Sequence, residues 1–359
     1  MLFDVDQIQN QSHQTKGIFM MNRTIQTAAI PFRKKLMSKT FNALFRGLAY
    51  CGRQMPNAKK QLSALEIIRD VPYGDLGEDQ LLDIYIPPKK HEGLRPAVFY
   101  VHGGGFVILS KDTHWSLALK FAQEDFVVFT INYRLAPTFA CPTALEDSAK
   151  ALLWVYENAE KYGVDRDRMI LAGESAGGNL VTSLCLCTLK DKGSQVTLDG
   201  ENYQAPWAKK IYELKKKDGS PWQPIAMMPA CGFLQSSTAE RYQGKVHPIY
   251  YDRITYVAAC YLQNQIGLLW ADPVVEFEND DTYERPIPPF CIIVGTADPV
   301  MDDSIRLHQA LRKRNVESQC HIHEGGVHAF HAFIQTKIAG RAWHDYHLFL
   351  EKLMNQYKS

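Results

Sequence analysis

One serine stands in a setting that suits nucleophilic catalysis. Ser175 lies within GESAG at residues 173–177, directly after the apolar run MILA and before an apolar stretch with helical spacing. A serine between a strand and a helix, with glycines two residues before and after it, can occupy a sharp turn that projects its hydroxyl above a sheet. The helix also points its first amide groups toward developing negative charge. The context indicates a nucleophile for acyl transfer rather than a chance glycine-rich loop.

A run of three glycines offers backbone donors for the oxyanion that such an attack creates. The sequence HGGGF at residues 102–106 follows the apolar run AVFYV. Preorganised N–H groups hold the oxyanion, and losing one of them costs on the order of 10²–10³ in rate. We expect the N–H groups of Gly103, Gly104 and Ala176 to form this oxyanion hole. A flexible turn would explain the glycines alone, but it would not explain their pairing with the serine motif downstream.

A serine hydroxyl needs a base, and the base needs an orienting acid. In folds with this strand–serine–helix turn, the acid follows the serine and the histidine comes last. Asp298 follows the apolar run CIIVG within GTADPVMDD, and we predict that it is the acid. Asp302 and Asp303 are the alternatives; they come one turn later, where acidic residues are common at a helix start.

His328 is predicted to be the base because it lies nearest the end of the strand-like run QCHIH, with His331 as its competitor. His321 and His323 alternate along that run, so they share one side of it and suit packed or solvated positions. The stretch HEGGVH resembles a zinc-binding helix motif. Its two histidines are five residues apart rather than four, and its glycines oppose a helix, so we predict no metal site.

Short apolar runs alternate with helical patterns from about residue 66 onward. The predicted strands are residues 81–86, 97–102, 127–133, 169–172, 225–229, 291–295 and 319–323. Helical patterns follow several of them, notably at residues 142–162 and 176–190. Apolar strands that alternate with helices predict an α/β fold with a mostly parallel sheet covered on both faces. The carboxyl ends of its strands then form the edge where chemistry takes place.

The chain of 359 residues suits one core with a cap. We expect residues 1–60 to form an N-terminal helical segment that is part of the cap. Residues 61–190 are predicted as the first part of the core, and residues 267–359 as the second. Between them, residues 191–266 are predicted as a cap insertion over the active-site edge that includes the sixth strand, near 224–230.

The charge and the cysteine content limit which partners and which cellular location we expect. A formal net charge of +1 gives no support for nucleic-acid binding. Residues 1–60 hold ten Lys or Arg against two acidic residues, so they can contact a membrane peripherally or dock on the protein's own body; we favour docking. No run of 18 apolar residues predicts a membrane span, and the polar first residues do not resemble a secretory signal. Eight scattered cysteines favour reduced thiols and a cytoplasmic location.

Taken together, these motifs resemble the hormone-sensitive-lipase family of α/β-hydrolases over roughly residues 80–335. The matching segments are HGGGF (102–106), NYRLAP (132–137), ALED (144–147), GESAGGN (173–179), GTADPVMDD (295–303) and GVHAF (326–330). The resemblance implies a carboxylic-ester hydrolase without a cofactor, and it assigns the same nucleophile, acid, base and oxyanion donors as above. It also implies an eight-stranded sheet whose second strand is antiparallel, with a cap built from the N-terminal helices and an insertion after the sixth strand.

The resemblance also bears on four other residues. It implies that His102 shapes the glycine loop and that Asp147 fixes loops near the serine turn. Two residues depart from the family pattern: Glu174 stands where Asp is usual, and Ala329 where Gly is usual.

We therefore predict a serine carboxylesterase or lipase-like hydrolase that acts on a small-molecule ester through an acyl-enzyme. One alternative is a non-catalytic small-molecule receptor on the same fold, although receptors of that kind typically lose the histidine that His328 supplies here. Another is an amide-cleaving hydrolase such as an arylformamidase.

Overall fold

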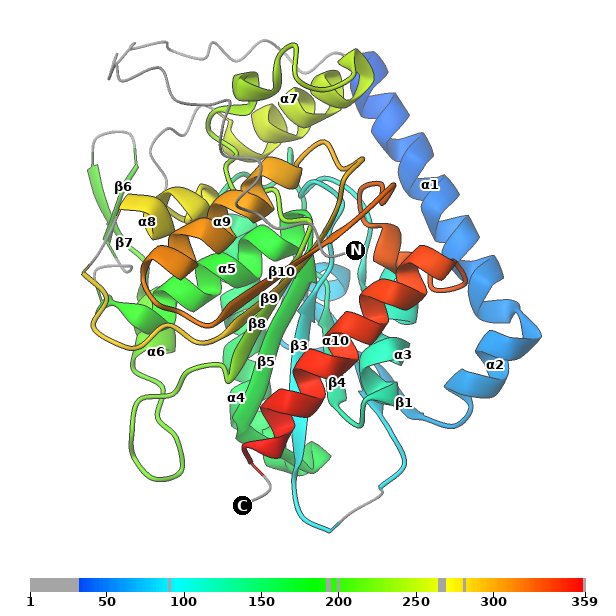
Figure 1. The fold of residues 1–359 in the computed structure, drawn as a ribbon, viewed down its shortest axis with the longest axis vertical. Coiled ribbons are helices and arrows are strands. Elements are labelled where there is room, and N and C mark those ends of the chain that lie inside the picture. Colours follow the sequence, from blue (N-terminus) through cyan, green and yellow to red (C-terminus); the bar gives the residue numbers. More distant parts are fainter. Residues whose placement is uncertain are drawn as a thin grey trace.

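An eight-stranded sheet forms the centre of the protein (Figure 1). The computed structural model describes residues 32–89, 92–191, 195–198, 201–263, 269–279 and 282–357. The strands lie in the order β1-β2-β4-β3-β5-β8-β9-β10. Their bounds are β1 Glu66–Pro72, β2 Leu81–Ile86, β3 Arg95–Val101, β4 Val127–Ile131, β5 Val164–Glu174, β8 Ala226–Ala230, β9 Phe290–Gly295 and β10 Ser318–His323. Only β2 runs antiparallel to its neighbours, which confirms the expected mostly parallel sheet with an antiparallel second strand.

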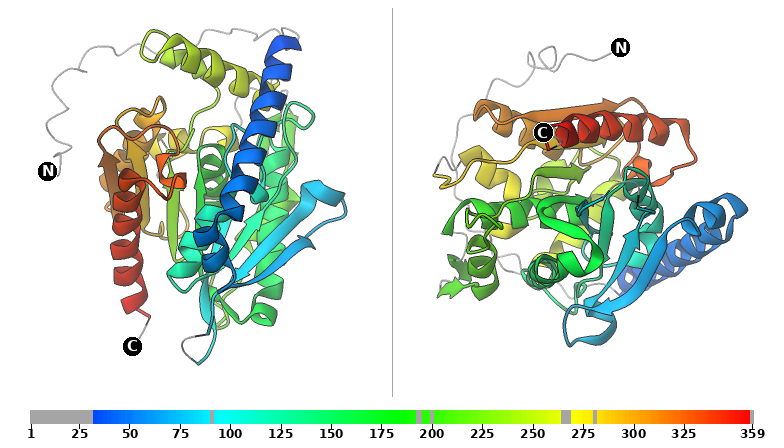
Figure 2. Two further views of the ribbon diagram at one scale, coloured as in Figure 1. Left: turned by 90° about the vertical axis from the view of Figure 1, so that its right-hand side faces the viewer. Right: turned by 90° about the horizontal axis from the view of Figure 1, so that it is seen from below.

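Helices cover both faces of the sheet (Figure 2). Their bounds are α1 Phe32–Gln54, α2 Pro56–Leu62, α3 Trp115–Gln123, α4 Thr143–Asn158, α5 Ala176–Leu189, α6 Pro206–Tyr212, α7 Pro248–Leu262, α8 Pro273–Asn279, α9 Met301–Lys313 and α10 Lys337–Asn355. Alternate side chains of β3 enter two separate apolar clusters. Phe99 and Val101 belong to a cluster that also contains residues of α4, α5, α8 and α9, whereas Val98 and Tyr100 belong to a cluster with residues of α3 and α10. The alternation follows from the two-residue period of a strand.

The helix that follows the serine motif is the most deeply placed. All 14 residues of α5 are buried, between the sheet and its neighbours α4, α6 and α8. Its sequence is apolar around the whole circumference apart from small hydroxyl, thiol and amide side chains, which is the pattern of an interior helix. This burial holds the first turn of α5 in a fixed position above the sheet.

The sequence pattern did not predict two of the strand regions. β1 is an edge strand whose residues are partly exposed, so Glu66–Pro72 lacks the apolar run that marks the inner strands. β6 (Gln195–Leu198) and β7 (Glu201–Gln204) form a separate antiparallel hairpin outside the main sheet. Both regions carry mixed polar and apolar residues, and their strand pairing depends on neighbours rather than on local hydrophobicity.

The predicted cap insertion does not all lie over the active-site edge. α6 packs against α4 and α5 on the flank of the core, which differs from our expectation for residues 191–266. Its buried residues Trp207, Ala208 and Ile211 belong to the main core cluster, and this explains its position. α7 reaches α1, where Arg253 donates a hydrogen bond to Ser38 at 2.8 Å.

The basic N-terminal segment docks on the protein's own body over its described part. The side chain of Asn42 accepts a hydrogen bond from the Leu109 N–H at 2.9 Å. The indole of Trp115 donates to the Ala49 carbonyl at 3.0 Å. Residues 1–31 of the predicted segment lie outside the described residues. Among the residues that are described, no helix is both long and apolar enough to cross a membrane.

Asp147 on α4 anchors the loop that follows β4. Its fully buried carboxylate accepts from the Arg134 guanidinium at 2.8 and 2.7 Å, and from the Arg134 backbone N–H at 2.9 Å. The side chain of Gln80 donates a further bond at 2.7 Å. The carboxylate therefore ties α4 to two other segments, and losing its cation would leave a buried charge uncompensated.

We expect Arg134→Met to lower the free energy of unfolding by about 3 kcal/mol, because it leaves Asp147 buried without its cation. Urea unfolding followed by circular dichroism measures the loss. The double variant with Asp147→Asn removes the stranded charge and should recover part of the stability. Equal losses in the single and double variants would contradict this account.

Candidate active site

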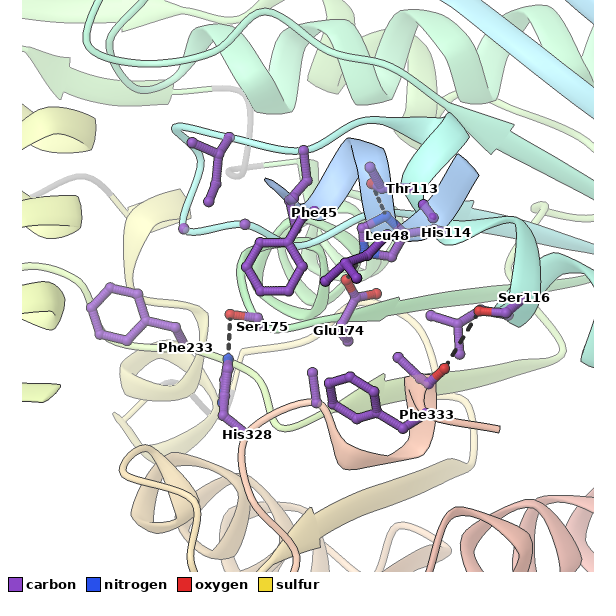
Figure 3. Close-up of a pocket in the computed structure, with 18 of the residues that line it drawn as sticks. Phe45, Leu48, Thr113, His114, Ser116, Glu174, Ser175, Phe233, His328 and Phe333 are labelled. Carbon is purple, nitrogen blue, oxygen red and sulfur yellow. Dashed lines mark hydrogen bonds and ion pairs between the residues drawn. The ribbon is translucent and has the colours of Figure 1, made fainter. Parts of the chain in front are cut away.

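The structure brings the predicted serine, histidine and carboxylate into one hydrogen-bonded line. The Ser175 hydroxyl lies 2.8 Å from Nε2 of His328 (Figure 3). Nδ1 of the same ring lies 3.0 Å from each carboxylate oxygen of Asp298. Because an ionised carboxylate only accepts, the ring donates from Nδ1, and Nε2 is left to accept from the serine. The three residues come from the β5–α5 turn and from the loops after β9 and β10.

Ser175 occupies a strained turn between β5 and α5. Its backbone has φ 55° and ψ −117°, a region that residues with a side chain rarely adopt. The Ser175 N–H donates to the Ala230 carbonyl at 3.0 Å, which ties the turn to the end of β8. A Cβ on Gly177 would lie 2.0 Å from the Val101 carbonyl oxygen, so glycine is required there. The turn therefore has the geometry that the GESAG motif predicts.

Asp298 and His328 are held by their own loops. The Val300 N–H donates to the Asp298 carboxylate at 2.9 Å, and the carboxylate is fully buried. Burial opposes a charge on His328, but the Asp298 charge and hydrogen bond outweigh it and raise the pKa of the imidazole. Ala329, next in the chain, has φ 55°, which explains why glycine is usual at that position.

The rival acids and the rival base lie elsewhere. Asp302 is exposed on α9. Asp303 is buried, where it pairs with Arg241 at 2.5 Å and accepts from the Leu234 N–H at 2.8 Å. His331 is buried, and this burial lowers its pKa to about 4.

The two strand histidines are packed residues, as their alternation predicted. Nδ1 of His321 and Nε2 of His323 lie 3.6 and 3.2 Å from the Asp345 carboxylate on α10. The resemblance of HEGGVH to a zinc motif therefore has no structural counterpart, because His323 and His328 face different carboxylates on different elements.

One cluster near the serine has the ligand types of a metal site. One potential ligand atom each from Cys231, Asp298 and His328 lies within 4.8 Å of the others. Burial and the nearby charges of Asp298 and Glu174 raise the pKa of the Cys231 thiol well above its usual value. A protonated thiol is a poor metal ligand, and the imidazole already bonds to the carboxylate and the serine. These residues fit proton transfer better than metal binding.

The hydrogen bonding of the glycine loop contradicts the prediction for one oxyanion donor. The Gly103 N–H donates to the Glu174 carboxylate at 2.5 Å, so it is already engaged and the prediction for Gly103 is wrong. Gly104 and Gly105 instead line the cavity beside Ser175. Gly104 has φ +106°, and a Cβ on it would lie 2.1 Å from the Ile108 carbonyl oxygen, so only glycine fits this bend. Ala176 is the first residue of α5, where the N–H has no helical acceptor.

The sequence analysis did not single out Gly105, which lines the cavity, although the same HGGGF motif contains it. All three glycines offer an N–H, and the order of residues along the loop does not show which N–H is already bonded. The signal lay in Glu174, the departure from the family pattern, because its longer side chain reaches back to the first glycine of the run.

Glu174 is the centre of a buried network beneath the glycine loop (Figure 3). Its carboxylate accepts from Nε2 of His114 at 2.6 Å and from the Tyr100 hydroxyl. Burial favours the neutral acid, but the charge of His114 and the hydrogen bonds from His114 and Tyr100 outweigh it and lower the Glu174 pKa to about 2. The pKa of His114 is raised in turn, since the carboxylate overcomes the cost of burying the cation.

His102 supports the loop from the other side, as the family resemblance implied. Its ring stacks on Tyr133 with centroids 4.3 Å apart, and the Tyr133 hydroxyl donates to the His102 carbonyl at 2.9 Å. Burial lowers the pKa of His102 to about 3, so the ring is neutral at physiological pH. Nδ1 lies 2.7 Å from the Gly103 carbonyl and donates to it.

A largely apolar cavity of about 510 Å³ opens in front of Ser175. Its walls come from α1, from α7 and from the loop after β10. Figure 3 shows Phe45 and Leu48 on one side and Phe333 on the other. The described part of the N-terminal segment thus forms a wall of the cavity, as do the pocket-facing residues of α7.

Comparisons with known proteins agree with this architecture. Arylacetamide deacetylase from Bos taurus is 37% identical over 137 residues, which are 37% of this chain and 33% of that protein. Lipase 2 from Moraxella sp. is 27% identical over 240 residues, and the chain spans 54% of its length. Esterase LipI from Mycobacterium tuberculosis is 26% identical over 305 residues, 84% of each chain.

Solved structures share the fold at low sequence identity. Esterase B from Lactobacillus Rhamnosis superposes with a TM-score of 0.70 at 17% identity, covering 90% of this chain and 95% of that one. Esterase LipW from Mycobacterium marinum gives a TM-score of 0.67 at 22% identity, covering 90% and 91%. A family model described as alpha/beta hydrolase fold matches residues 98–332, more than half of the chain. The protein therefore belongs to this α/β-hydrolase family, whose members resemble hormone-sensitive lipase.

Proposed function

We propose that the protein is a serine carboxylesterase that cleaves small-molecule carboxylic esters through an acyl-enzyme. The observation that carries the proposal is the 2.8 Å contact between the Ser175 hydroxyl and Nε2 of His328, with Asp298 on the opposite ring nitrogen. As the serine oxygen attacks the ester carbonyl, His328 takes its proton and then delivers it to the departing alcohol. Asp298 keeps the ring in the required tautomer and stabilises the imidazolium that forms.

The oxyanion hole in this mechanism consists of the N–H groups of Gly104, Gly105 and Ala176. Gly104 and Gly105 lie in the cavity wall beside the nucleophile, and Ala176 begins the helix whose positive end faces the same point. Donors fixed before the reaction need no reorganisation when the charge develops. Water then attacks the acyl-enzyme with His328 as base, which releases the acid and restores the Ser175 hydroxyl.

The lining of the cavity supports an apolar group on the substrate. Side chains such as Phe45, Leu48 and Phe333 offer burial rather than hydrogen bonds. Amides are the second candidate substrate class, because one relative is named arylacetamide deacetylase. The same nucleophile and base act on both classes, so a matched ester and amide must be compared directly.

We also propose a reducing compartment, the cytoplasm, and a mechanism that uses no cofactor. The eight cysteines form no disulfide, and six of them are buried, which supports a reducing compartment. Every proton and charge in the proposed steps is handled by Ser175, His328, Asp298 and backbone N–H groups.

Ser175→Ala is expected to lower ester turnover on the order of 10⁴-fold or more, because no other described hydroxyl is bonded to His328. The measurement uses p-nitrophenyl acetate and its matched amide, p-nitroacetanilide, with thermal melting to confirm that the variant is folded. We expect the wild-type protein to cleave the ester faster. A folded variant that keeps most of its ester activity would refute the assignment.

The pH dependence should follow the raised pKa of His328. Only the neutral imidazole can accept the serine proton, so kcat/KM rises as pH rises through that pKa, with its inflection above the ordinary value of 6.5. Asp298→Asn removes the charge that raises the pKa, so the inflection should move to lower pH while the rate falls. An inflection that stays in place in this variant argues against Asp298 as the partner of the base.

Glu174→Gln is expected to lower kcat by at least about tenfold with little change in KM, because the glycine loop loses its charged acceptor and the oxyanion donors shift. The loop would stabilise the transition state more than the bound substrate. A lower kcat at an unchanged KM is therefore the result expected for displaced oxyanion donors. Asp345→Asn, which changes a partly exposed carboxylate on α10 that pairs with His321 and His323 outside the cavity, serves as the matched control. An unchanged kcat in a folded Glu174→Gln variant would show that the network does not position the loop.

A further inference from the structure

Arg253 on α7 gives the cavity wall a cation that has no carboxylate partner among the described residues. One of its nitrogens donates to the Ser38 hydroxyl at 2.8 Å, and its guanidinium carbon lies 5.3 Å from the centroid of the Tyr256 ring. Burial lowers the pKa of Arg253, and the opposing effects of Tyr256 and Cys260 do not outweigh it. By contrast, the carboxylate neighbours of Arg134 raise its pKa.

The position of Arg253 relates it directly to the reacting centre. Arg253 and Val257 both line the cavity, and residues four apart share one face of a helix. Val257 packs on the glycine loop, since a Cβ placed on Gly105 would lie 2.7 Å from its Cγ1. Arg253 therefore lies one helical turn, about 6 Å along the axis, beyond the residue that contacts the proposed oxyanion loop.

The other charged groups of the cavity wall are already engaged. Both oxygens of Glu174 accept hydrogen bonds from Gly103, His114 and Tyr100. A guanidinium has five N–H groups in a planar fork that matches a carboxylate, and the bond to Ser38 uses only one of the five on Arg253. An anion on a bound substrate would thus find an available partner in an otherwise largely apolar wall.

We propose that Arg253 forms an anion subsite that favours esters carrying a carboxylate remote from the scissile bond. This inference rests on the proposed ester hydrolysis at Ser175 and names a class of substrate for the same site. The apolar lining accepts the chain between the two ends of such a substrate, and the guanidinium binds the free carboxylate. The subsite acts on binding, so its effect belongs to KM.

Two substrate series test the subsite on the full-length protein. One contains p-nitrophenyl monoesters of dicarboxylic acids with four to ten carbons, each paired with the methyl-terminated ester of the same length. The other contains acetates of ω-hydroxy acids paired with acetates of simple alcohols, followed by acid release. The readout is the ratio of kcat/KM for the charged ester to that for its neutral partner.

For at least one chain length, the wild-type ratio should exceed one, and Arg253→Gln should lower it about tenfold through KM. Arg253→Lys should keep part of the preference because it keeps the charge, and added salt should weaken it. Ser38→Ala is the matched control: it removes the hydrogen-bond partner of Arg253 but not the cation, so the ratio should persist. Ratios that are the same in the wild-type protein and in folded Arg253→Gln at every length would overturn the proposal.

A binding measurement separates this inference from the proposed function. Ketone analogues of the same paired esters, which cannot be hydrolysed, are titrated into both proteins by calorimetry. Tighter binding of the charged ketone that is lost in Arg253→Gln supports the subsite even without ester turnover, in which case the proposed esterase activity alone fails. Turnover of neutral esters with no charge preference in either assay overturns the subsite alone.

Discussion

The close approach of the β5–α5 turn to the strands on both sides is the constraint on which the site depends. Gly177 lies against the Val101 carbonyl at the end of β3. On the other side, the Ser175 N–H bonds to the Ala230 carbonyl, and the Ser175 carbonyl accepts from the Phe233 N–H at 3.1 Å. A positive φ at a non-glycine residue costs on the order of 1–3 kcal/mol. The turn keeps this conformation because neighbours on both sides hold its backbone.

Two carboxylates near this turn have different surroundings and so serve different purposes. The side chain of Asp298 pairs with the ring of His328, and this pairing keeps the imidazole oriented toward Ser175. Glu174, adjacent to the nucleophile, is saturated by donors from three other residues and holds the glycine loop. Burial keeps His102 neutral close by, so the loop gains a rigid stacked support without another charge.

The core and the cap contribute separately to function. The sheet and α5 hold Ser175, Asp298 and His328 in place, whereas α1 and α7 supply much of the cavity wall. The bond between Arg253 and Ser38 joins these two helices. Such a division, with fixed groups on the sheet and a variable wall around them, lets one fold support many specificities.

Local pattern was enough to predict the three residues that the structure joins by hydrogen bonds. Ser175 and Asp298 each follow a buried apolar strand, and His328 follows the more polar edge strand β10. Parallel strands end at one edge, so the convergence of the three residues could be predicted from strand order. The inner strands were equally clear because both of their faces are buried. β1 was missed because an edge strand needs apolar residues on part of its surface only.

Only the tertiary structure decided which N–H groups of the glycine run are free. Gly103, Gly104 and Gly105 are identical in sequence terms, and the carboxylate that engages the first of them comes from 71 residues further along the chain. The place of α6 on the flank, and of Arg253 in the cavity wall, likewise depends on contacts between distant segments. The sequence alone predicted the serine, carboxylate and imidazole that meet, because each follows the end of a strand and strand ends can be read from local pattern. The hydrogen-bond partners and the packing of the helices around the cavity could be seen only in the folded chain. They depend on contacts between segments far apart in the sequence, and several chemically equivalent groups could have made each contact.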